Sequence, residues 1–205
     1  MKPWLSVSVF SLPALLVSLW PNCHGFLCFD RSAILQGQLW RLWTGHWVHF
    51  SSSHLWWNMA AMVVAAAWLE ASRPGLLLRF TAVAAPLLSL GLLGFETNMT
   101  IYGGLSGVGT GVITLLGIRL IQSPRSDRHI GFGVLGLVIA KLSHDAWSQT
   151  SLLSEFGSAH IHSSLSAHVM GAGLALSFHA VGLYRRSTSN AATPPMVGVQ
   201  SRINE

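Results

Sequence analysis

The fold of this chain is decided at Tyr102–Gly111, which reads YGGLSGVGTG and opens an apolar run that ends at Ile121. Five glycines surround one serine, Ser106. Because glycine has no side chain, Gly104 and Gly107 leave room beside the serine hydroxyl, and Gly107, Gly109 and Gly111 form a face that lets a second helix approach closely. The same residues are as typical of a plain packing face between membrane helices. The stretch therefore predicts a close helix contact with a candidate nucleophile at its mouth.

A histidine far along the chain favours the functional interpretation. His168 lies in Ala167–Gly171, which reads AHVMG inside another apolar run. Serine is a weak nucleophile unless a neighbouring base takes its proton, and histidine is the commonest such base. We expect the Ser106 hydroxyl and a His168 ring nitrogen within or slightly beyond hydrogen-bond reach. Gly171 and Gly173 would let the two helices meet.

The composition indicates an integral membrane protein. Of 205 residues, 9% are charged and 51% hydrophobic, and the mean hydropathy is +0.49, which is far above the usual range for a soluble domain. Six runs are long enough, or nearly so, to cross about 30 Å of hydrocarbon. They are Trp4–Trp20, His54–Glu70, Leu76–Phe95, Leu105–Ile121, Ile130–Trp147 and Ser164–Tyr184. The predicted fold class is an all-α bundle of six transmembrane helices, with a long external loop between the first two.

The net charge of +5 is explained by topology. On the six-span arrangement, nine of the 12 basic residues fall on one side, Arg31 and Arg41 fall on the other, and Lys141 lies within a span. Lys and Arg gather on the cytoplasmic side, so both termini are predicted to be cytoplasmic and no nucleic-acid partner is indicated. Residues 1–186 form the predicted membrane domain, and the polar residues 187–205 a disordered cytoplasmic tail.

The predicted external loop, residues 21–53, is too apolar to stay solvated. Trp40, Trp43 and Trp47 suit the membrane interface, where an aromatic ring lies at headgroup depth. Cys23 and Cys28 also lie in this loop, and the sequence leaves open whether they form a disulfide.

His54 and Asn58 are four residues apart and project from one helical face. Polar groups at this depth are costly unless paired, so both are predicted to be functional or inside the bundle. Together with His46 and His49, His54 also suggests zinc. No His-Glu-x-x-His is present and no nearby carboxylate completes a ligand set, so we predict no metal.

Three acidic groups have structural interpretations. Glu70 is predicted to be a hydrogen-bond partner at the end of its helix, and Asp145 to pair with Lys141 four residues earlier. Neither Asp145 nor Glu96 is expected to orient His168. The run after Ser106 spans only about 24 Å, so Ser106 should be recessed at a helix N-terminus, where free N–H groups favour an oxyanion.

Taken together, these motifs resemble the rhomboid intramembrane serine proteases. The Trp-Arg pair, the His-x-x-x-Asn, the Gly-x-Ser-Gly and the Ala-His-x-x-Gly occur in the family's order. The resemblance implies a Ser106–His168 dyad without a cofactor, and an oxyanion hole formed by His54, Asn58 and the Ser106 backbone N–H. The structural positions that it implies are Trp40, Arg41, His49, Glu70, Gly104, Gly107 and Gly171. Gly45 departs from the pattern, because many relatives carry a further loop histidine there.

The small size and the Gly-Leu-Ser-Gly wording are most similar to the rhombosortase branch, whose members are implicated in trimming C-terminal Gly-Gly anchors. The implied partners are transmembrane protein substrates with such anchors, and membrane lipids. The implied location is the bacterial inner membrane, with the active site opening to the periplasm.

Two other functions remain open. A non-catalytic rhomboid-like protein would bind membrane helices without cutting them, but the presence of both Ser106 and His168 argues against it. A transporter could use intramembrane histidines as a proton relay. Its expected inverted repeat or paired broken helices are not visible in the sequence.

Overall fold

The computed structural model of the chain describes residues 3–123, 125–148 and 165–192, and these residues are almost all helical. The elements are α1 (Pro3–Leu19), η1 (Pro21–Cys23), α2 (His24–Leu27), β1 (Phe29–Asp30), α3 (Arg31–Leu35), α4 (Arg41–Thr44), η2 (Gly45–Trp47), α5 (Ser52–Ser72), α6 (Leu76–Phe95), β2 (Ile101–Tyr102), α7 (Ser106–Ile121), α8 (Arg125–Ser148) and α9 (Leu165–Ala192). Each of the six predicted apolar runs coincides with a long helix, so the all-α class is confirmed.

Within the described residues, three helices are long and apolar enough to cross a membrane: α6, residues 127–148 of α8 and residues 165–185 of α9. α1 with the short helix after it is a fourth candidate, bent by 105°. α7 is apolar but has only 16 residues. In α5, the polar side chains of His54, Asn58 and Glu70 lower the mean hydropathy. These apolar helices identify the chain as an integral membrane protein.

α9 is longer than the sequence predicts. It continues to Ala192, so the first six residues of the predicted tail, 187–192, extend the helix. The rest of that tail, residues 193–205, lies outside the described residues.

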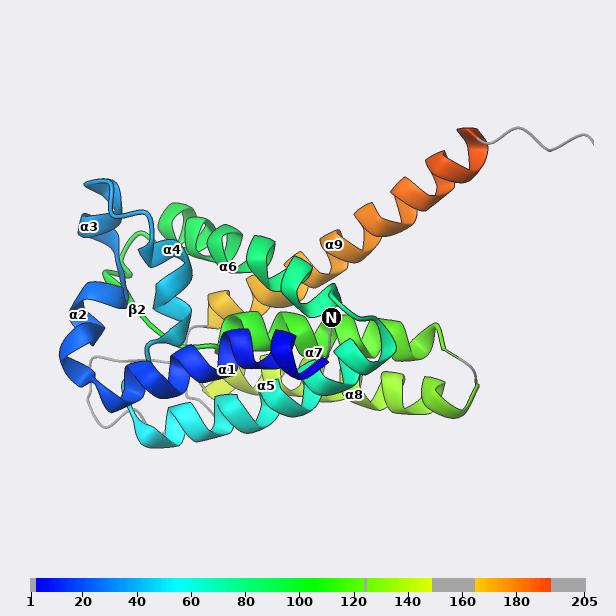
Figure 1. The fold of residues 1–205 in the computed structure, drawn as a ribbon, viewed down its shortest axis with the longest axis horizontal. Helices are drawn as coiled ribbons and strands as arrows, with labels where there is room; N and C mark the ends of the chain where they lie inside the picture. The colour runs from blue at the N-terminus through cyan, green and yellow to red at the C-terminus, as the bar shows by residue number, and fades with distance from the viewer. Residues whose placement is uncertain (1–2, 124, 149–164, 193–205) are drawn as a thin grey trace, which may run out of the picture.

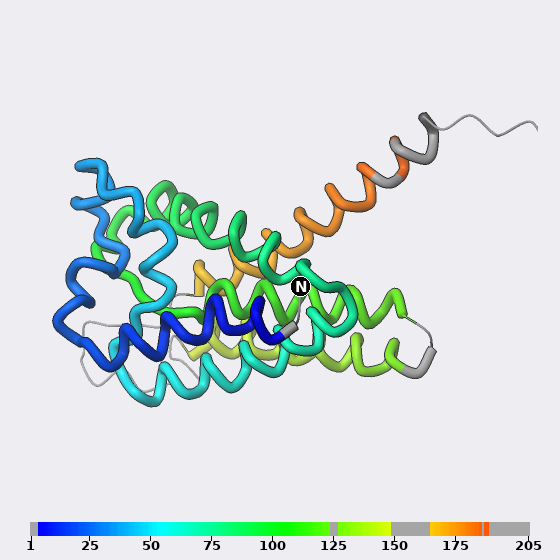
Figure 2. The backbone as a smooth tube through the Cα atoms, viewed as in Figure 1, coloured from blue at the N-terminus to red at the C-terminus, as the bar shows by residue number. Residues whose placement is uncertain are grey.

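α7 lies at the centre of the bundle, in contact with α5, α6, α8 and α9 (Figure 1, Figure 2). Eleven of its 16 residues are buried. A helix that is covered on nearly every side must bring neighbours close, and small residues permit this. The glycines at the start of α7 therefore serve packing as well as the site.

The contact between α7 and α9 is a backbone contact. A Cβ atom added to Gly171 would lie 2.0 Å from the carbonyl oxygen of Gly107, and one added to Gly111 would lie 2.7 Å from that of Gly171. The predicted glycine face on α7 therefore meets Gly171. Gly173 is not part of it, because a Cβ there would meet nothing within 4 Å.

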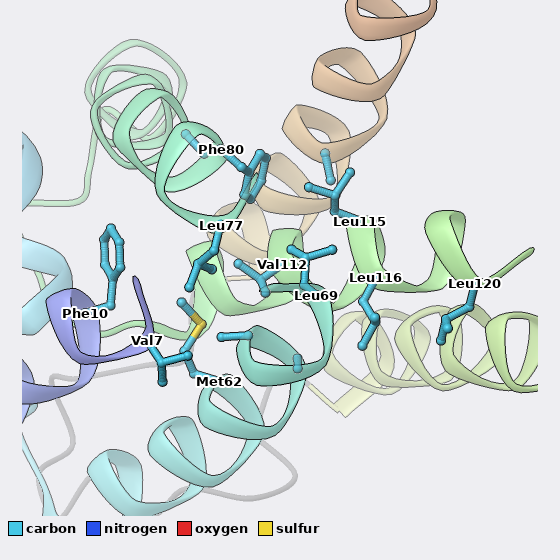
Figure 3. Close-up of a cluster of buried hydrophobic side chains, with 14 residues drawn as sticks. Val7, Phe10, Met62, Leu69, Leu77, Phe80, Val112, Leu115, Leu116 and Leu120 are labelled. Carbon is cyan, nitrogen blue, oxygen red and sulfur yellow. The ribbon is translucent and has the colours of Figure 1, made fainter. Parts of the chain in front are cut away.

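A hydrophobic cluster holds the C-terminal part of α7, the end away from Ser106 (Figure 3). It joins side chains of five helices. Its large members include Val7, Phe10, Met62, Leu69, Leu77, Phe80, Val112, Leu115, Leu116 and Leu120. Interior packing of this kind tolerates little movement, so the helix that carries Ser106 is firmly anchored.

The connection between α1 and α5 buries much of itself, as its apolar composition predicts. Phe29 and Val48 are fully buried, whereas Trp40 and Trp43 stay about 40% exposed, as expected for interface aromatics. β1 pairs antiparallel with β2, which sets Phe29 opposite Tyr102. This connection is therefore tied to the segment that leads into Ser106. Cys23 and Cys28 are both free.

Candidate active site

Ser106 is the first residue of α7. It is half-buried, whereas its neighbours from Tyr102 to Val112 are all buried. The backbone N–H groups of a first helical turn have no partner within the helix and point outward with the positive end of the helix dipole. Ser106 thus combines an accessible hydroxyl with donors suited to a developing negative charge.

Gly104 sets the turn before Ser106 and brings His54 beside it. Its φ of +133° is a conformation that other residues rarely adopt, and a Cβ there would lie 2.5 Å from the Cε1 atom of His54. His54 lies in the first turn of α5, where Ser51 accepts a hydrogen bond from its backbone N–H. Only glycine at position 104 therefore permits this approach.

Asn58 lies one turn after His54 on α5 and is half-buried. Its Nδ2 atom is buried and has no hydrogen-bond partner within the described residues. A buried amide without a partner costs about 1–3 kcal/mol, so this donor is available for an oxygen that enters the site.

His168 lies in the first turn of α9 and is 2% exposed. Its Nδ1 atom is 3.0 Å from Oδ2 of Asp145. Its Nε2 atom is buried and has no hydrogen-bond partner among the described residues, so the hydrogen bond to Ser106 is not formed here. The two segments still touch, because a Cβ on Gly107 would lie 3.0 Å from the carbonyl oxygen of Ala167.

The expectation that no carboxylate orients His168 is wrong. Asp145 is 4% exposed and contacts the imidazole directly. It also forms the predicted pair with Lys141, whose Nζ atom lies 3.1 Å from His168 Nδ1. Nδ1 of His144 is 3.9 Å from the other Asp145 oxygen. The i, i+4 spacing predicts the pair but not which side of α8 faces His168.

His49 connects the loop to the residue before Ser106. Its Nδ1–H donates to the carbonyl of Trp47 (3.1 Å), and its Nε2 accepts the backbone N–H of Leu105 (3.4 Å). Both nitrogens are thus used by the neutral ring. Burial lowers the pKa of His49 to about 4, because a charge is disfavoured away from water. His49 is therefore neutral at pH 7.

His46 is a buried loop histidine that none of the sequence motifs places in the site. Its Nε2 contacts the carbonyl of Ala85 (2.9 Å) and the hydroxyl of Ser89 (3.1 Å) on α6, and burial lowers its pKa. The preceding Gly45 accepts the backbone N–H of Gly104 (3.2 Å). A Cβ at Gly45 would lie 2.8 Å from the backbone nitrogen of Phe29, so a larger residue does not fit.

Tyr102 is a second side chain at the site that the motifs did not single out. Its hydroxyl donates to the carbonyl of Gly104 (3.2 Å). Burial raises the pKa of Tyr102 to about 12, partly opposed by hydrogen bonding from the Ser106 side chain and the Gly107 backbone. Its place directly before the two glycines was the only available signal in the sequence.

Three other predicted positions lie apart from Ser106. Arg41 is buried and donates to the carbonyls of Gly25 (2.9 Å) and Cys28 (2.7 Å). The neighbouring Trp40 donates from Nε1 to the carbonyl of Phe26 (3.2 Å). These contacts hold the loop between α1 and α5 in shape.

Glu70 is fully buried. It accepts the backbone N–H groups of Gly75 (2.8 Å) and Leu77 (2.7 Å). These are free donors at the start of α6, so Glu70 joins α5 to α6 at the end opposite His54.

The fold and the site together define a helical membrane protein in which the turn that carries Ser106 touches the segment of His168, and His168 contacts Asp145. A family model described as Rhomboid domain matches residues 36–185. The match covers more than half of the chain, which therefore belongs to the rhomboid family; its members are generally intramembrane serine proteases that act on transmembrane substrates. Comparison with the curated proteins gives no match.

Proposed function

We propose that this chain is an active intramembrane serine protease with Ser106 as nucleophile and His168 as general base. The observation that carries the proposal is the state of His168. One ring nitrogen is bonded to Asp145, while the other is buried without a partner among the described residues, in a segment that touches the Ser106 turn. A histidine held in this way is suited to accept a proton.

The reaction is acyl transfer. Ser106 Oγ attacks the carbonyl carbon of the scissile peptide bond while Nε2 of His168 takes the hydroxyl proton. That proton then passes to the leaving nitrogen, and the C–N bond breaks. Nε2 of His168 then takes a proton from water, which attacks the Ser106 ester, and the same proton passes to Ser106 Oγ as the ester C–O bond breaks. The hydrogen bond between Ser106 and His168 is absent from the described residues, and catalytic hydrogen bonds often tighten only when substrate binds.

The negative charge on the substrate oxygen is stabilised by the Ser106 backbone N–H, His54 and Asn58. The N-terminus of α7 adds the positive end of its dipole. Support comes from the contact of His54 with Gly104 and from Nδ2 of Asn58, which has no partner in the part of the chain that the structure describes. In a water-poor site, such donors contribute more than they would at a surface.

The arrangement in the membrane that we propose has six spans, with both termini in the cytoplasm of a bacterial cell. Helices α1, α5, α6, α7, α8 and α9 are the six spans, and the connection between α1 and α5 lies on the periplasmic side. The 16 residues of α7 reach about 24 Å, less than the hydrocarbon thickness. Ser106 is then recessed below the periplasmic surface and opens toward it.

The substrate that we propose is a membrane-anchored protein whose transmembrane segment carries glycines near its outer end. The space beside Gly104 and Gly107 is filled by His54, Leu88 and Ala167, so large substrate side chains are disfavoured near Ser106. A peptide bond inside a helix must also unwind before attack. These features agree with C-terminal Gly-Gly anchors and the rhombosortase branch.

A fluorophosphonate probe tests the proposal in the native membrane. It should label the wild-type protein and fail to label the Ser106→Ala and His168→Ala variants. Ser72→Ala is the matched control, because that hydroxyl donates to the carbonyl of Leu69 within its own helix and its loss should leave labelling intact. A folded wild-type protein that is never labelled would instead favour the non-catalytic alternative.

A further inference from the structure

Asp145 is a buried acid that needs its partners. Its side chain is 2% exposed, and an ionised carboxylate inside a membrane bundle is stable only when it is paired and hydrogen-bonded. Its Oδ2 atom contacts Lys141 on its own helix and His168 on α9. The carboxylate therefore connects two helices at the imidazole.

We propose that Asp145 is a positioning residue that sets the tautomer of His168. Its carboxylate accepts Nδ1–H, which leaves the lone pair on Nε2 free to take the Ser106 proton, and it stabilises the imidazolium that follows. This inference rests on the proposed function of Ser106 and His168. It makes the site a serine, histidine and aspartate triad rather than a dyad, with the acid on the helix before the histidine.

Lys141 gives the inference a sharp consequence. Its ammonium group can only donate, and it lies 3.1 Å from the same Nδ1 atom. Nδ1 cannot donate to Asp145 and accept from Lys141 at the same time. While Asp145 accepts from both groups, the ring keeps the productive tautomer. Without the carboxylate, Lys141 donates to Nδ1, and the proton of His168 moves to Nε2, where it blocks the base.

Two variants separate this role from a structural one. Asp145→Asn should lower kcat by about 100-fold or more with little change in KM, because losing the acid of a triad leaves the wrong tautomer. Asp145→Ala should be equally inactive. Adding Lys141→Met to it should restore at least about 10-fold of the lost kcat, since no donor then occupies Nδ1. If the pair were purely structural, the unpaired ammonium would lower the stability of Asp145→Ala, Lys141→Met would restore that stability, and kcat of the folded protein would not follow the tautomer of His168.

The tautomer itself can be read from the ¹⁵N shifts of His168 in detergent micelles. The wild-type protein should show Nδ1–H, and Asp145→Asn should show Nε2–H. Asp30→Asn is the matched control, because Asp30 caps α3 through the backbone N–H of Ala33 (3.0 Å) and should alter neither the tautomer nor kcat. Nε2–H in the wild-type protein, or full kcat in folded Asp145→Asn, overturns the inference. An unlabelled wild-type Ser106 overturns the proposed function instead.

A second, independent feature is a cavity of about 690 Å³ between α6 and α9. The two helices diverge toward the C-terminal end of α9 (Figure 1). One end of the cavity is apolar, and the other is lined by arginines. The apolar lining includes Phe80, Val83, Leu87, Leu174, Phe178 and Val181, and the arginines are Arg73, Arg79, Arg119 and Arg185.

The arginines at one end of the cavity and the apolar side chains at the other match the charged head and the apolar tail of an amphiphile. From Leu76 to Leu87 on α6, and from Leu174 to Arg185 on α9, the lining runs about 16 Å along each helix. This is a length suited to much of an acyl chain. Within the described part of the chain, Arg73, Arg79 and Arg185 form no salt bridge. Their charges are therefore available to an anionic headgroup.

We propose that this cavity binds an anionic phospholipid of the cytoplasmic leaflet. The acyl chain lies between α6 and α9. The guanidinium groups bind the phosphate, because their paired N–H donors match its oxygens. The site rests on the membrane orientation proposed above, and it lies apart from the Ser106 site. A lipid that fills the gap would set the angle of α9, the helix that carries His168.

Native mass spectrometry of the detergent-purified protein tests the site. Phosphatidylglycerol should bind, and phosphatidylcholine with the same chains should bind at least about 10-fold more weakly. Arg79→Gln and Arg185→Gln should each weaken the binding of phosphatidylglycerol by about 5-fold. Val83→Trp should also weaken this binding, because the larger side chain fills the apolar end of the cavity. Arg128→Gln is the charge-matched control, because Arg128 lies over the Phe132 ring on α8.

Equal binding of the two lipids overturns the proposal, as does an equal loss in Arg128→Gln. Inorganic phosphate that competes with phosphatidylglycerol at similar concentration also overturns it, because the acyl chain would then contribute nothing.

Discussion

At the scale of single residues, the site depends on histidines whose two ring nitrogens have different partners. His49 donates to Trp47 and accepts from Leu105. His168 is hydrogen-bonded to Asp145 through Nδ1, and its Nε2 has no partner among the described residues. An imidazole with one nitrogen engaged has a defined tautomer. In the mechanism proposed above, the two histidines therefore have different roles: His49 positions the Ser106 turn and His168 transfers the proton.

The first prediction at this scale concerns the oxyanion donors. His54→Ala and Asn58→Ala should each lower kcat by about 10-fold or more, because each removes a donor while the backbone N–H of Ser106 remains. Turnover of a glycine-containing transmembrane substrate in liposomes provides the measurement. Asn98→Ala, which changes an exposed amide, should have no effect. Unchanged kcat in both site variants would remove these side chains from the mechanism.

The second prediction concerns pH. The pKa of His49 is about 4 in the folded protein and about 6.5 when unfolded. A depressed folded pKa stabilises the fold fully above pH 6.5, and that stability is lost as the pH falls toward 4. Unfolding in detergent should therefore show a loss of about 2 kcal/mol between about pH 7.5 and about pH 5 from this residue.

His49→Gln serves as the control for that measurement. Glutamine does not titrate, so the variant should lose less stability than the wild-type protein between the same two pH values. If the two proteins lost the same amount, the pH dependence would originate elsewhere.

At the scale of helices, the decisive contact is between α7 and α9. Gly107, Gly111 and Gly171 bring two backbones together, and the residues beside them, Ser106 and His168, are carried with them. Catalytic groups must be held to within a fraction of an ångström. The glycines that pack α7 against α9 therefore also set the geometry of the site.

Two alanine variants on α9 test this contact. Gly171→Ala should destabilise the protein by about 2–3 kcal/mol and reduce kcat, since its Cβ would meet the carbonyl oxygen of Gly107 at 2.0 Å and overpacking has costs of this size. Gly173→Ala, with nothing within 4 Å, should be neutral or stabilising because alanine favours helix. Thermal unfolding in detergent compares the two. Equal stability would show that the backbones are further apart.

At the scale of the whole molecule, the short central helix explains why the bundle is built around α7. Longer neighbours cover α7, and Ser106 at its start is half-buried; in the membrane arrangement proposed above, this residue is recessed below the periplasmic surface. The folded connection between α1 and α5 and the pairing of β1 with β2 cover the side of the Ser106 turn. A substrate must enter this arrangement in an extended form.

The prediction at this scale concerns substrate choice. Glycine lowers the helix stability of a segment by about 1 kcal/mol per residue relative to alanine, so consecutive glycines near the outer end of a substrate helix should favour cleavage. Two Gly→Leu changes should suppress the cleavage rate in the same membrane, and restoring one glycine should recover part of it. A leucine variant cut as fast as its parent would contradict both the unwinding argument and the Gly-Gly specificity.

The sequence by itself determined the helices and the main chemical groups. Hydropathy and helix-breaking residues act locally, so all six apolar runs could be located, and α6 has the predicted bounds. The start of α7 at Ser106 also follows from local residues, because the glycines before it break the helix. The family match over residues 36–185 agrees with the motifs.

Only the tertiary structure decided which side each helix presents. The spacing of Lys141 and Asp145 predicts their pair, but the contact of Asp145 with His168 depends on the rotation of α8 against α9. The roles of His46 and Tyr102 likewise depend on partners on α6 and around the Ser106 turn. Such contacts join residues distant in the chain, so no local pattern encodes them.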